Sequence, residues 1–114
     1  MVNCPIEFRA LIEMEYTLIL GKTFEKEFEK LDKSIRNEAW KKIERLKNNP
    51  ENMGKHLRHL NLWELKIQMY RIFYFIDNNQ IRILLLSVKH KDDTDKYVRG
   101  LSIENIKQLL NDAS

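Results

Sequence analysis

The sequence contains one cysteine, two prolines and three glycines among its 114 residues. A single cysteine cannot form a disulfide within the chain, which excludes the disulfide-stapled class of small domains and points to a reducing, cytoplasmic compartment. The scarcity of glycine and proline excludes collagen-like and low-complexity chains and indicates long regular elements joined by short turns. No hydrophobic run approaches the length of a membrane span, and the first residues lack the continuous apolar segment of a signal peptide, so we expect no membrane partner.

Charged residues are numerous and nearly balanced. They make up 32% of the sequence, with 20 lysines and arginines against 17 aspartates and glutamates, for a net charge of +3. A polyanion responds to a local cluster of charge more than to the total. The segment from Lys55 to Arg71 alone matches this net charge of +3, because four basic side chains in it are opposed by one acidic side chain, Glu64.

Hydrophobic periodicity divides the chain into helices and strands. The expected elements are a strand, two helices, three strands and a helix, over residues 15–20, 24–31, 34–47, 63–67, 70–76, 81–88 and 102–110. Thr23 and Ser102 are the expected N-caps of the first and last helices. The apolar side of the last helix is expected to comprise Ile103, Ile106, Leu109 and Leu110.

Short turns connect the three consecutive strands, and the sequence Asp77–Gln80 is typical of such a turn. Strands joined in this way are antiparallel neighbours. The compact arrangement is then an antiparallel meander with the helices packed on one face. The sequence therefore predicts an α+β fold with an N-terminal strand, a helical hairpin, the meander and a C-terminal helix.

A two-residue turn at Gln68–Met69 would place two cations opposite each other. With this turn, Lys66 on one strand lies directly across from Arg71 on the next. Like charges in direct opposition destabilise a sheet, and an anionic ligand would offset that cost. The alternative is that both side chains extend into water and that Glu64, on the same face, neutralises them.

A second basic segment follows the third strand of the meander. Lys89, His90 and Lys91 are consecutive, and Tyr97 and Arg99 come shortly after them. Since this segment leaves the sheet beside a central strand, we expect its cations to converge with those of the hairpin. His90 is a candidate proton shuttle, because histidine gains and loses a proton near neutral pH. The alternative is a solvated loop whose aspartates dilute the positive charge.

The connector between the helices and the strands holds a third basic group. Its members are Lys55, His56, Arg58 and His59. Two histidines three residues apart could share a metal ion on a helix, but no acidic residue or thiol stands at a matching spacing, so we expect no metal site. The sequence also lacks a glycine-rich phosphate loop and a nucleophile elbow, and we expect no cofactor.

Several stretches together carry a resemblance to a known family. They are Tyr16–Leu20, Phe24–Leu31, Leu62–Ile67, Tyr70–Tyr74 and Ser87–Lys91, the last followed by Tyr97 six residues on. In this order and spacing, from about Met14 to Leu110, the sequence resembles the RelE/ParE superfamily of small toxins. The most specific parts are the strand pair Trp-Glu-Leu-Lys-Ile and Tyr-Arg-Ile-Phe-Tyr and the basic-His-basic segment with its tyrosine.

The resemblance implies a RelE-like microbial ribonuclease-type fold in one domain over residues 14–114. Residues 1–13 are then an extension, which is either foreign to a native protein that starts at Met14 or a helix of its own. The implied function is that of a toxin of a toxin–antitoxin pair, either a ribosome-dependent mRNA endoribonuclease or a gyrase poison. The implied partners are a cognate antitoxin, mRNA in the ribosomal A site and ribosomal RNA. The last helix either completes the core or is displaced by the antitoxin.

The positions that match the RelE branch are Lys66, Arg71, Lys91 and Tyr97. Together with His90 they form the expected catalytic set. The residues expected to bind RNA or the ribosome are Lys55, Arg58, Lys89 and Arg99. Two departures from the family pattern stand out: Glu64 occupies the place of a frequent second lysine, and Lys91 replaces an arginine, a point charge in place of a planar fork.

Metal-free RNA cleavage needs a base for the 2′-hydroxyl, donors for the charge on the phosphoryl oxygens and an acid for the leaving 5′-oxygen. We expect Lys66 and Arg71 to hold the scissile phosphate and Tyr97 to stack on or orient a nucleobase of the RNA. The expected proton-transfer groups are Glu64 or Lys66 as the base and His90 or Lys91 as the acid. Two other functions stay open, namely a gyrase-directed toxin on the same fold and a non-catalytic module whose basic face binds RNA or an acidic partner.

Overall fold

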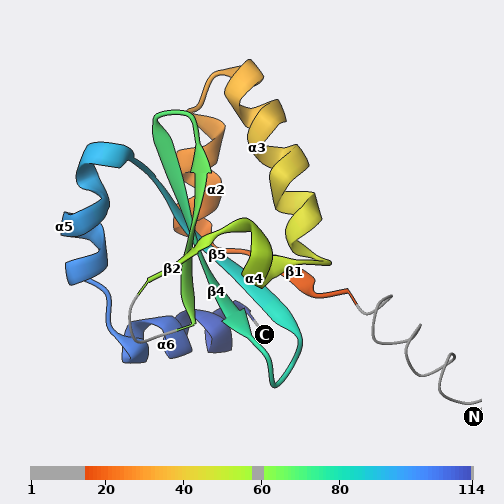
Figure 1. Ribbon diagram of the computed structural model, residues 1–114. Helices are drawn as coiled ribbons and strands as arrows, with labels where there is room; N and C mark the ends of the chain where they lie inside the picture. Colours follow the sequence, from red (N-terminus) through yellow and green to blue (C-terminus); the bar gives the residue numbers. More distant parts are fainter. Residues whose placement is uncertain (1–14, 58–60, 114) are drawn as a thin grey trace, which may run out of the picture.

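The computed structural model describes residues 15–57 and 61–113. Its elements are, in chain order, β1 (Thr17–Leu20), α2 (Lys22–Glu29), α3 (Lys33–Leu46), α4 (Pro50–Met53), β2 (Lys55–His56), β3 (Leu62–Ile67), β4 (Tyr70–Asp77), β5 (Arg82–His90), the 3₁₀-helix η1 (Lys91–Asp93), α5 (Thr94–Arg99) and α6 (Ile103–Ala113). The predicted α+β fold, with its strand, helical hairpin, meander and last helix, is confirmed (Figure 1). The expected extension over residues 1–13 lies outside the described residues.

One five-stranded sheet runs through the molecule in the order β1-β5-β4-β3-β2. As predicted, β3, β4 and β5 are antiparallel neighbours, and β1 pairs in parallel with β5. The edge strand β2 and the short helix α4 lie in the segment that we expected to be only a polar connector. Elements of two and four residues are too short to show hydrophobic periodicity, so the sequence pattern missed both.

Helices cover both faces of this sheet, so the expectation that they pack on one face is wrong (Figure 1). Buried residues of α2 and α3 pack against Leu65, Ile72 and Tyr74 on one side, here called the α3 face. On the other side, called the α5 face, α5 and α6 pack against Phe73 and Leu84. The reason is that β4 and β5 are apolar at successive positions, which makes both of their faces hydrophobic.

The hairpin between β3 and β4 has the predicted register. Ile67 pairs with Tyr70, and Lys66 with Arg71, across a two-residue turn. Gln68, the first residue of this turn, has a positive φ of 53°. Such a turn matches the twist of the strands that it joins, which fixes the register and therefore which side chains share a face.

Of the two predicted helix N-caps, one is confirmed and one is wrong. The backbone N–H of Asn105 donates to the Ser102 hydroxyl at 3.2 Å, so the predicted cap of α6 is confirmed. Thr23 is not a cap, because α2 already begins at Lys22, after Gly21. A Cβ at Gly21 would lie 2.8 Å from the carbonyl oxygen of Leu85, so the close approach of this segment to β5 requires glycine.

Two predictions about the C-terminal third need correction. β5 continues to His90, so Lys89 and His90 lie within the strand, and the polar stretch after it contains α5. In α6, Ile106 and Leu110 are buried as expected, but Ile103 and Leu109 are 45% and 40% exposed. Up to Asn111, the part of α6 whose burial is described, a narrow stripe with Ile106 and Leu110 is therefore the part buried in the core.

Candidate functional site

Three cations lie in one row across the sheet. Lys66 of β3 pairs with Arg71 of β4, and Arg71 pairs with Lys89 of β5. Residues paired in this way point to the same face, and Arg71 shares its face with Phe73, which belongs to the core on the α5 face. The predicted opposition of Lys66 and Arg71 is confirmed, and Lys89 extends it to a row of three.

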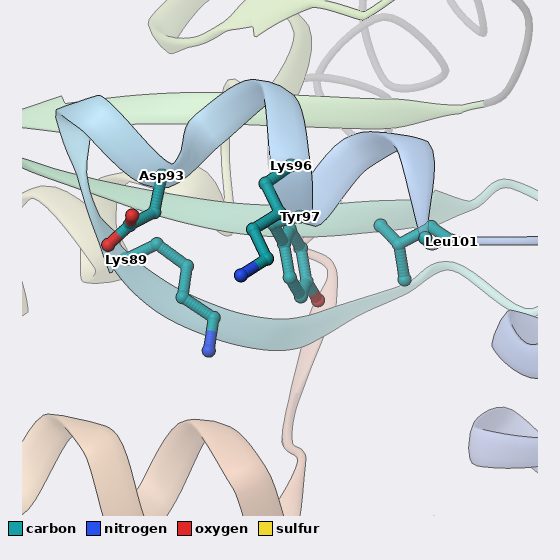
Figure 2. A pocket seen from close by; sticks show the side chains of 6 residues that line it. Lys89, Asp93, Lys96, Tyr97 and Leu101 are labelled. Carbon is teal, nitrogen blue, oxygen red and sulfur yellow. The ribbon is translucent and has the colours of Figure 1, made fainter.

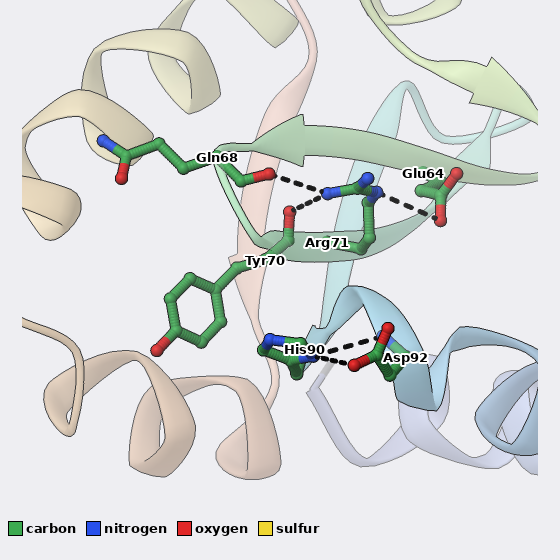
Figure 3. Close-up of polar contacts among 6 residues, drawn as sticks. All are labelled: Glu64, Gln68, Tyr70, Arg71, His90 and Asp92. Atoms are coloured by element: carbon green, nitrogen blue, oxygen red, sulfur yellow. Dashed lines mark hydrogen bonds and ion pairs between the residues drawn. The ribbon is translucent and has the colours of Figure 1, made fainter.

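The guanidinium of Arg71 donates hydrogen bonds to the β3–β4 turn (Figure 3). Its Nη1 donates to the carbonyl oxygens of Gln68 at 3.0 Å and Tyr70 at 2.9 Å, and its Nε lies 3.8 Å from Oε1 of Glu64. The side chains of Arg71 and Glu64 are only 16% and 13% exposed. Lys66 is exposed, so it is the more accessible of the two opposed cations.

Glu64 lies in the next row of the same face. In the strand register it lies opposite the exposed Lys55 of β2 on one side and opposite Phe73 of β4 on the other. Together with its ion pair to Arg71, this places one carboxylate among basic side chains from three strands. This surface, with basic side chains on three strands, therefore also holds one carboxylate.

A pocket of about 480 Å³ lies between β5 and α5. Its lining residues are Lys89, Asp93, Lys96, Tyr97, Gly100 and Leu101. Figure 2 shows Lys96 and Tyr97 reaching from α5 toward Lys89 on the strand. Sequence reasoning missed Lys96, although it directly precedes Tyr97, because this short polar segment was expected to have no helix that would bring the side chain back over the sheet.

Tyr97 forms one wall of this pocket. Its ring packs on Phe73, with 4.7 Å between the centroids, and Nζ of Lys89 lies 5.5 Å from the Tyr97 centroid. Burial raises the pKa of Tyr97 to about 12, a hydrogen bond with the Ser87 side chain acts to lower it, and the negative charge of Glu27 acts to raise it. The tyrosine is therefore neutral at physiological pH, with an aromatic face beside a cation.

Glu27 of α2 reaches the same end of β5. Its carboxylate accepts hydrogen bonds from the Ser87 hydroxyl and from the backbone N–H of Val88, the latter at 3.0 Å. Its Oε2 also lies 2.6 Å from Nζ of Lys89, as an ion pair. No pattern in the sequence links α2 with a strand some sixty residues later, so sequence reasoning could not place Glu27 at the site.

His90 points away from the row of cations. It pairs with Tyr70, whose ring packs on the α3 face, and the two ring centroids are 6.0 Å apart (Figure 3). Its Nδ1 accepts a hydrogen bond from the backbone N–H of Asp92 at 3.2 Å. The expectation that the whole basic segment converges on the hairpin cations is therefore wrong for His90, because successive residues of a strand face opposite sides.

Lys91 begins η1 beside the β3–β4 turn. Its backbone N–H donates to the carbonyl oxygen of Met69 at 2.8 Å, and the residue is exposed.

Arg99 is exposed at the end of α5, where its Nε donates to the Asp95 carbonyl of the same helix. Arg58 and His59 lie outside the described residues. Within the described residues, no three His, Cys, Asp or Glu side chains are placed to hold a metal ion.

A family model and several solved structures match this chain. The model of the ParE toxin of type II toxin–antitoxin systems, parDE, matches residues 18–94. A chain of the RelBE2 toxin–antitoxin complex from Mycobacterium tuberculosis is 25% identical, with a TM-score of 0.60, and the match covers 67% of this chain and 98% of that one. A search of curated proteins found no match.

Two further structures support the same fold. A double arginine-to-alanine mutant of the E. coli toxin RelE in the free state is 23% identical with a TM-score of 0.67, over 77% of this chain and all (100%) of that one. A chain of the RelE–RelB complex from Pyrococcus horikoshii is 19% identical with a TM-score of 0.59, over 68% and 97% of the two chains.

In the described part of the chain, no helix has the length and apolar character needed to cross a membrane.

Proposed function

The chain belongs to the RelE/ParE superfamily of toxins of type II toxin–antitoxin systems, and from this premise we propose that it cleaves mRNA on the ribosome without a metal ion. The observation that carries the proposal is the row of Lys66, Arg71 and Lys89 on one face of the sheet, next to Tyr97. The proposed partners are mRNA in the A site and ribosomal RNA, and the proposed location is the cytoplasm.

The cation row fits a phosphodiester backbone. Phosphates along a single strand are bound chiefly through lysine and arginine side chains, and such binding weakens as salt rises. Lys66 is exposed, and the contacts of Arg71 involve its Nη1 and Nε, so we assign its Nη2 to the scissile phosphate. Tyr97 and the pocket beside it would receive a base of the same strand, because aromatic rings stack on bases of any sequence.

The reaction that we propose is attack of the 2′-hydroxyl on the adjacent phosphorus. Glu64 takes the proton of the 2′-hydroxyl as the oxygen–phosphorus bond forms, and the cations stabilise the charge on the phosphoryl oxygens. The bond from phosphorus to the 5′-oxygen then breaks, and Lys91 gives this oxygen a proton. The products are a 2′,3′-cyclic phosphate and a 5′-hydroxyl end. Lys91 takes this role in place of His90, which lies on the α3 face.

A translating extract tests the proposal. The wild-type protein is expected to give new RNA ends on a translated message and none on the same RNA without ribosomes. Tyr97→Phe keeps the ring and is expected to cleave within about threefold of wild type if stacking is its role, whereas Tyr97→Ala is expected to lose about tenfold or more. Equal activity of all three proteins would remove Tyr97 from the site. Salt-sensitive RNA binding with no product on ribosomes would identify a binding module instead of a nuclease.

A second candidate function is inhibition of DNA gyrase. The observation that favours it is that the family model matching residues 18–94 is that of the ParE toxin. In this case the cations of the sheet are incidental, and the contact surface is the helical hairpin of α2 and α3. A supercoiling assay with purified gyrase separates the two functions, because the ribosome-dependent nuclease is expected to leave supercoiling unchanged.

We further propose that the partner of this chain is an antitoxin protein, as in the RelBE complexes whose structures resemble it. Ile103 and Leu109 flank the buried Ile106 and Leu110 on α6 and are themselves 45% and 40% exposed, so the contact of this helix with the core is narrow. We therefore expect limited proteolysis of the free protein to remove residues beyond Arg99 early, and an antitoxin to occupy the face that α6 leaves. Protection of α6 as long as that of β5 would contradict its displacement.

A further inference from the structure

We propose that Glu27 is a positioning residue of the candidate site, which fixes the ammonium group of Lys89 and the ring of Tyr97 at the pocket between β5 and α5. The consequence for RNA cleavage rests on the function proposed above. The positioning itself rests on contacts of the folded protein alone, and it can be tested without any substrate.

The contacts of Glu27 begin at the edge of the sheet. Among residues 15–57 and 61–113, β1 pairs with β5 only from Arg82 to Leu85, and the continuation of β5 has no described strand on that side. The chain turns at Gly21 into α2, and Glu27 brings its carboxylate to this edge, where it accepts the N–H of Val88 at 3.0 Å. The N–H of Val88, which has no described strand partner at this edge, thus donates to a charged carboxylate, and hydrogen bonds to charged acceptors are strong.

The same carboxylate then holds side chains of β5 on the α5 face. Ser87 donates its hydroxyl to Oε1 of Glu27, and Nζ of Lys89 lies 2.6 Å from Oε2. Ser87 is fully buried, and the side chains of Lys89 and Glu27 are 30% and 23% exposed. Each of the two carboxylate oxygens therefore has a separate partner, which fixes the orientation of the group.

Tyr97 is coupled to this arrangement from α5. Its ring lies 5.5 Å from Nζ of Lys89, and its phenol shares a hydrogen bond with Ser87. The negative charge of Glu27 also contributes to the raised pKa of Tyr97. One carboxylate on α2 thus contacts both groups that in turn contact the tyrosine.

Glu27 also affects the charge beside the pocket. Removal of its carboxylate charge leaves Lys89 without this counter-charge, which adds one net positive charge beside the proposed RNA path. RNA is then expected to bind at least as tightly, whereas cleavage is expected to slow, because Lys89 and Tyr97 lose their fixed positions. A purely structural role of Glu27 would instead lower binding and cleavage together, in proportion to the fraction of folded protein.

The test compares Glu27→Gln with Glu29→Gln, an equal change of charge at an exposed position of the same helix. Labelling of Lys89 by an amine-specific reagent, followed by mass spectrometry, is expected to be about threefold faster in Glu27→Gln only, as for a part-exposed ion pair that opens. The ring signals of Tyr97, assigned by NMR through Tyr97→Phe, are expected to shift in the same variant. For cleavage on ribosomes, kcat is expected to fall about tenfold with KM unchanged or lower.

The outcomes separate this proposal from the proposed function. Equal labelling and equal ring signals in wild type and both variants would overturn the positioning role. Changed labelling and changed signals in a protein that cleaves no RNA would support positioning and refute the nuclease. If Glu27→Gln does not fold, Lys89→Met removes the ion pair together with the cation beside the Tyr97 ring, and it leaves the bonds of Glu27 to Ser87 and Val88. An unchanged Tyr97 ring signal in that variant would also overturn the proposal.

Discussion

Replacing Arg71 with lysine separates the structural contacts of this residue from its charge. The guanidinium donates to the carbonyl oxygens of Gln68 and Tyr70 at 3.0 and 2.9 Å, and it lies 3.8 Å from Glu64. One nitrogen of the guanidinium, Nη1, donates to both turn carbonyls, and a lysine keeps the positive charge on a shorter side chain that does not place its ammonium at the position of Nη1. The variant is therefore expected to weaken the hairpin while it leaves the cation row charged.

The magnitude follows from the two hydrogen bonds. Both bonds come from a charged donor, the one to Gln68 at an exposed position and the one to Tyr70 at a part-buried position, and each is worth about 1 kcal/mol. Arg71→Lys is therefore expected to lose about 2 kcal/mol of unfolding free energy. In a chain of this length, that loss lowers Tm by about 8 °C. Arg71→Met is expected to lose about 3 kcal/mol, because it also leaves the Glu64 carboxylate, 13% exposed, without its cation.

The assay combines thermal denaturation with RNA binding at several salt concentrations. For a single strand, each phosphate contact contributes about 0.7 to the slope of log K against log salt. Arg71→Lys is expected to keep the wild-type slope, and Arg71→Met to reduce it by about 0.7. Lys66→Gln is the matched control, since this exposed residue is expected to give the same reduction of slope with almost no change in Tm. An unchanged Tm in Arg71→Lys would refute the structural contacts, and an unchanged slope in both charge-removing variants would refute the cation row.

Three further predictions concern stability. Tyr74→Phe is expected to cost about 1–2 kcal/mol in urea denaturation, because the buried phenol donates to the Pro50 carbonyl at 2.6 Å and the oxygen loses its partner; equal midpoints would contradict this. Gly54→Ala is expected to destabilise far more than Gly100→Ala, since a Cβ at Gly54 would lie 2.9 Å from the Glu64 carbonyl oxygen, against 3.6 Å for the nearest atom at Gly100; similar Tm values would refute the close packing. The pKa of Tyr97, about 12 when folded, exceeds the value near 10 of an unfolded chain, so stability is expected to fall between pH 10 and 12 and to fall less in Tyr97→Phe; parallel Tm–pH curves would show that burial does not shift this group.

The hairpin shows how far the sequence alone reaches. Alternation with period two and a two-residue turn determine which residues pair, so the opposition of Lys66 and Arg71 follows from the order of the residues. The same rule, applied to a strand that continues to His90, separates Lys89 from His90 by face. The error for His90 came from ending the strand two residues early, where the apolar pattern stops but the ladder of hydrogen bonds continues.

Other parts of the site could not be read from the sequence. The bond between Glu27 and Val88 depends on where a helix from the start of the chain meets the open edge of β5, which is a tertiary contact with no local signal. The pocket depends on α5, a six-residue helix that is too short to show hydrophobic periodicity in the sequence. The two-sided packing follows from β4 and β5, whose continuous apolar runs fit a strand buried on both faces as well as one buried on a single face.

The most direct test of the central claim maps RNA ends by primer extension on a message translated in an extract, with equal amounts of folded protein. Wild type and Lys41→Gln, which removes one exposed charge from the helix over the α3 face, are expected to give the same new 5′ ends. Lys66→Gln is expected to reduce those ends about tenfold, because it removes the accessible cation of the row on the α5 face. Undiminished ends with Lys66→Gln, or no new ends with wild type, would contradict the assignment of this face as the site that cleaves RNA.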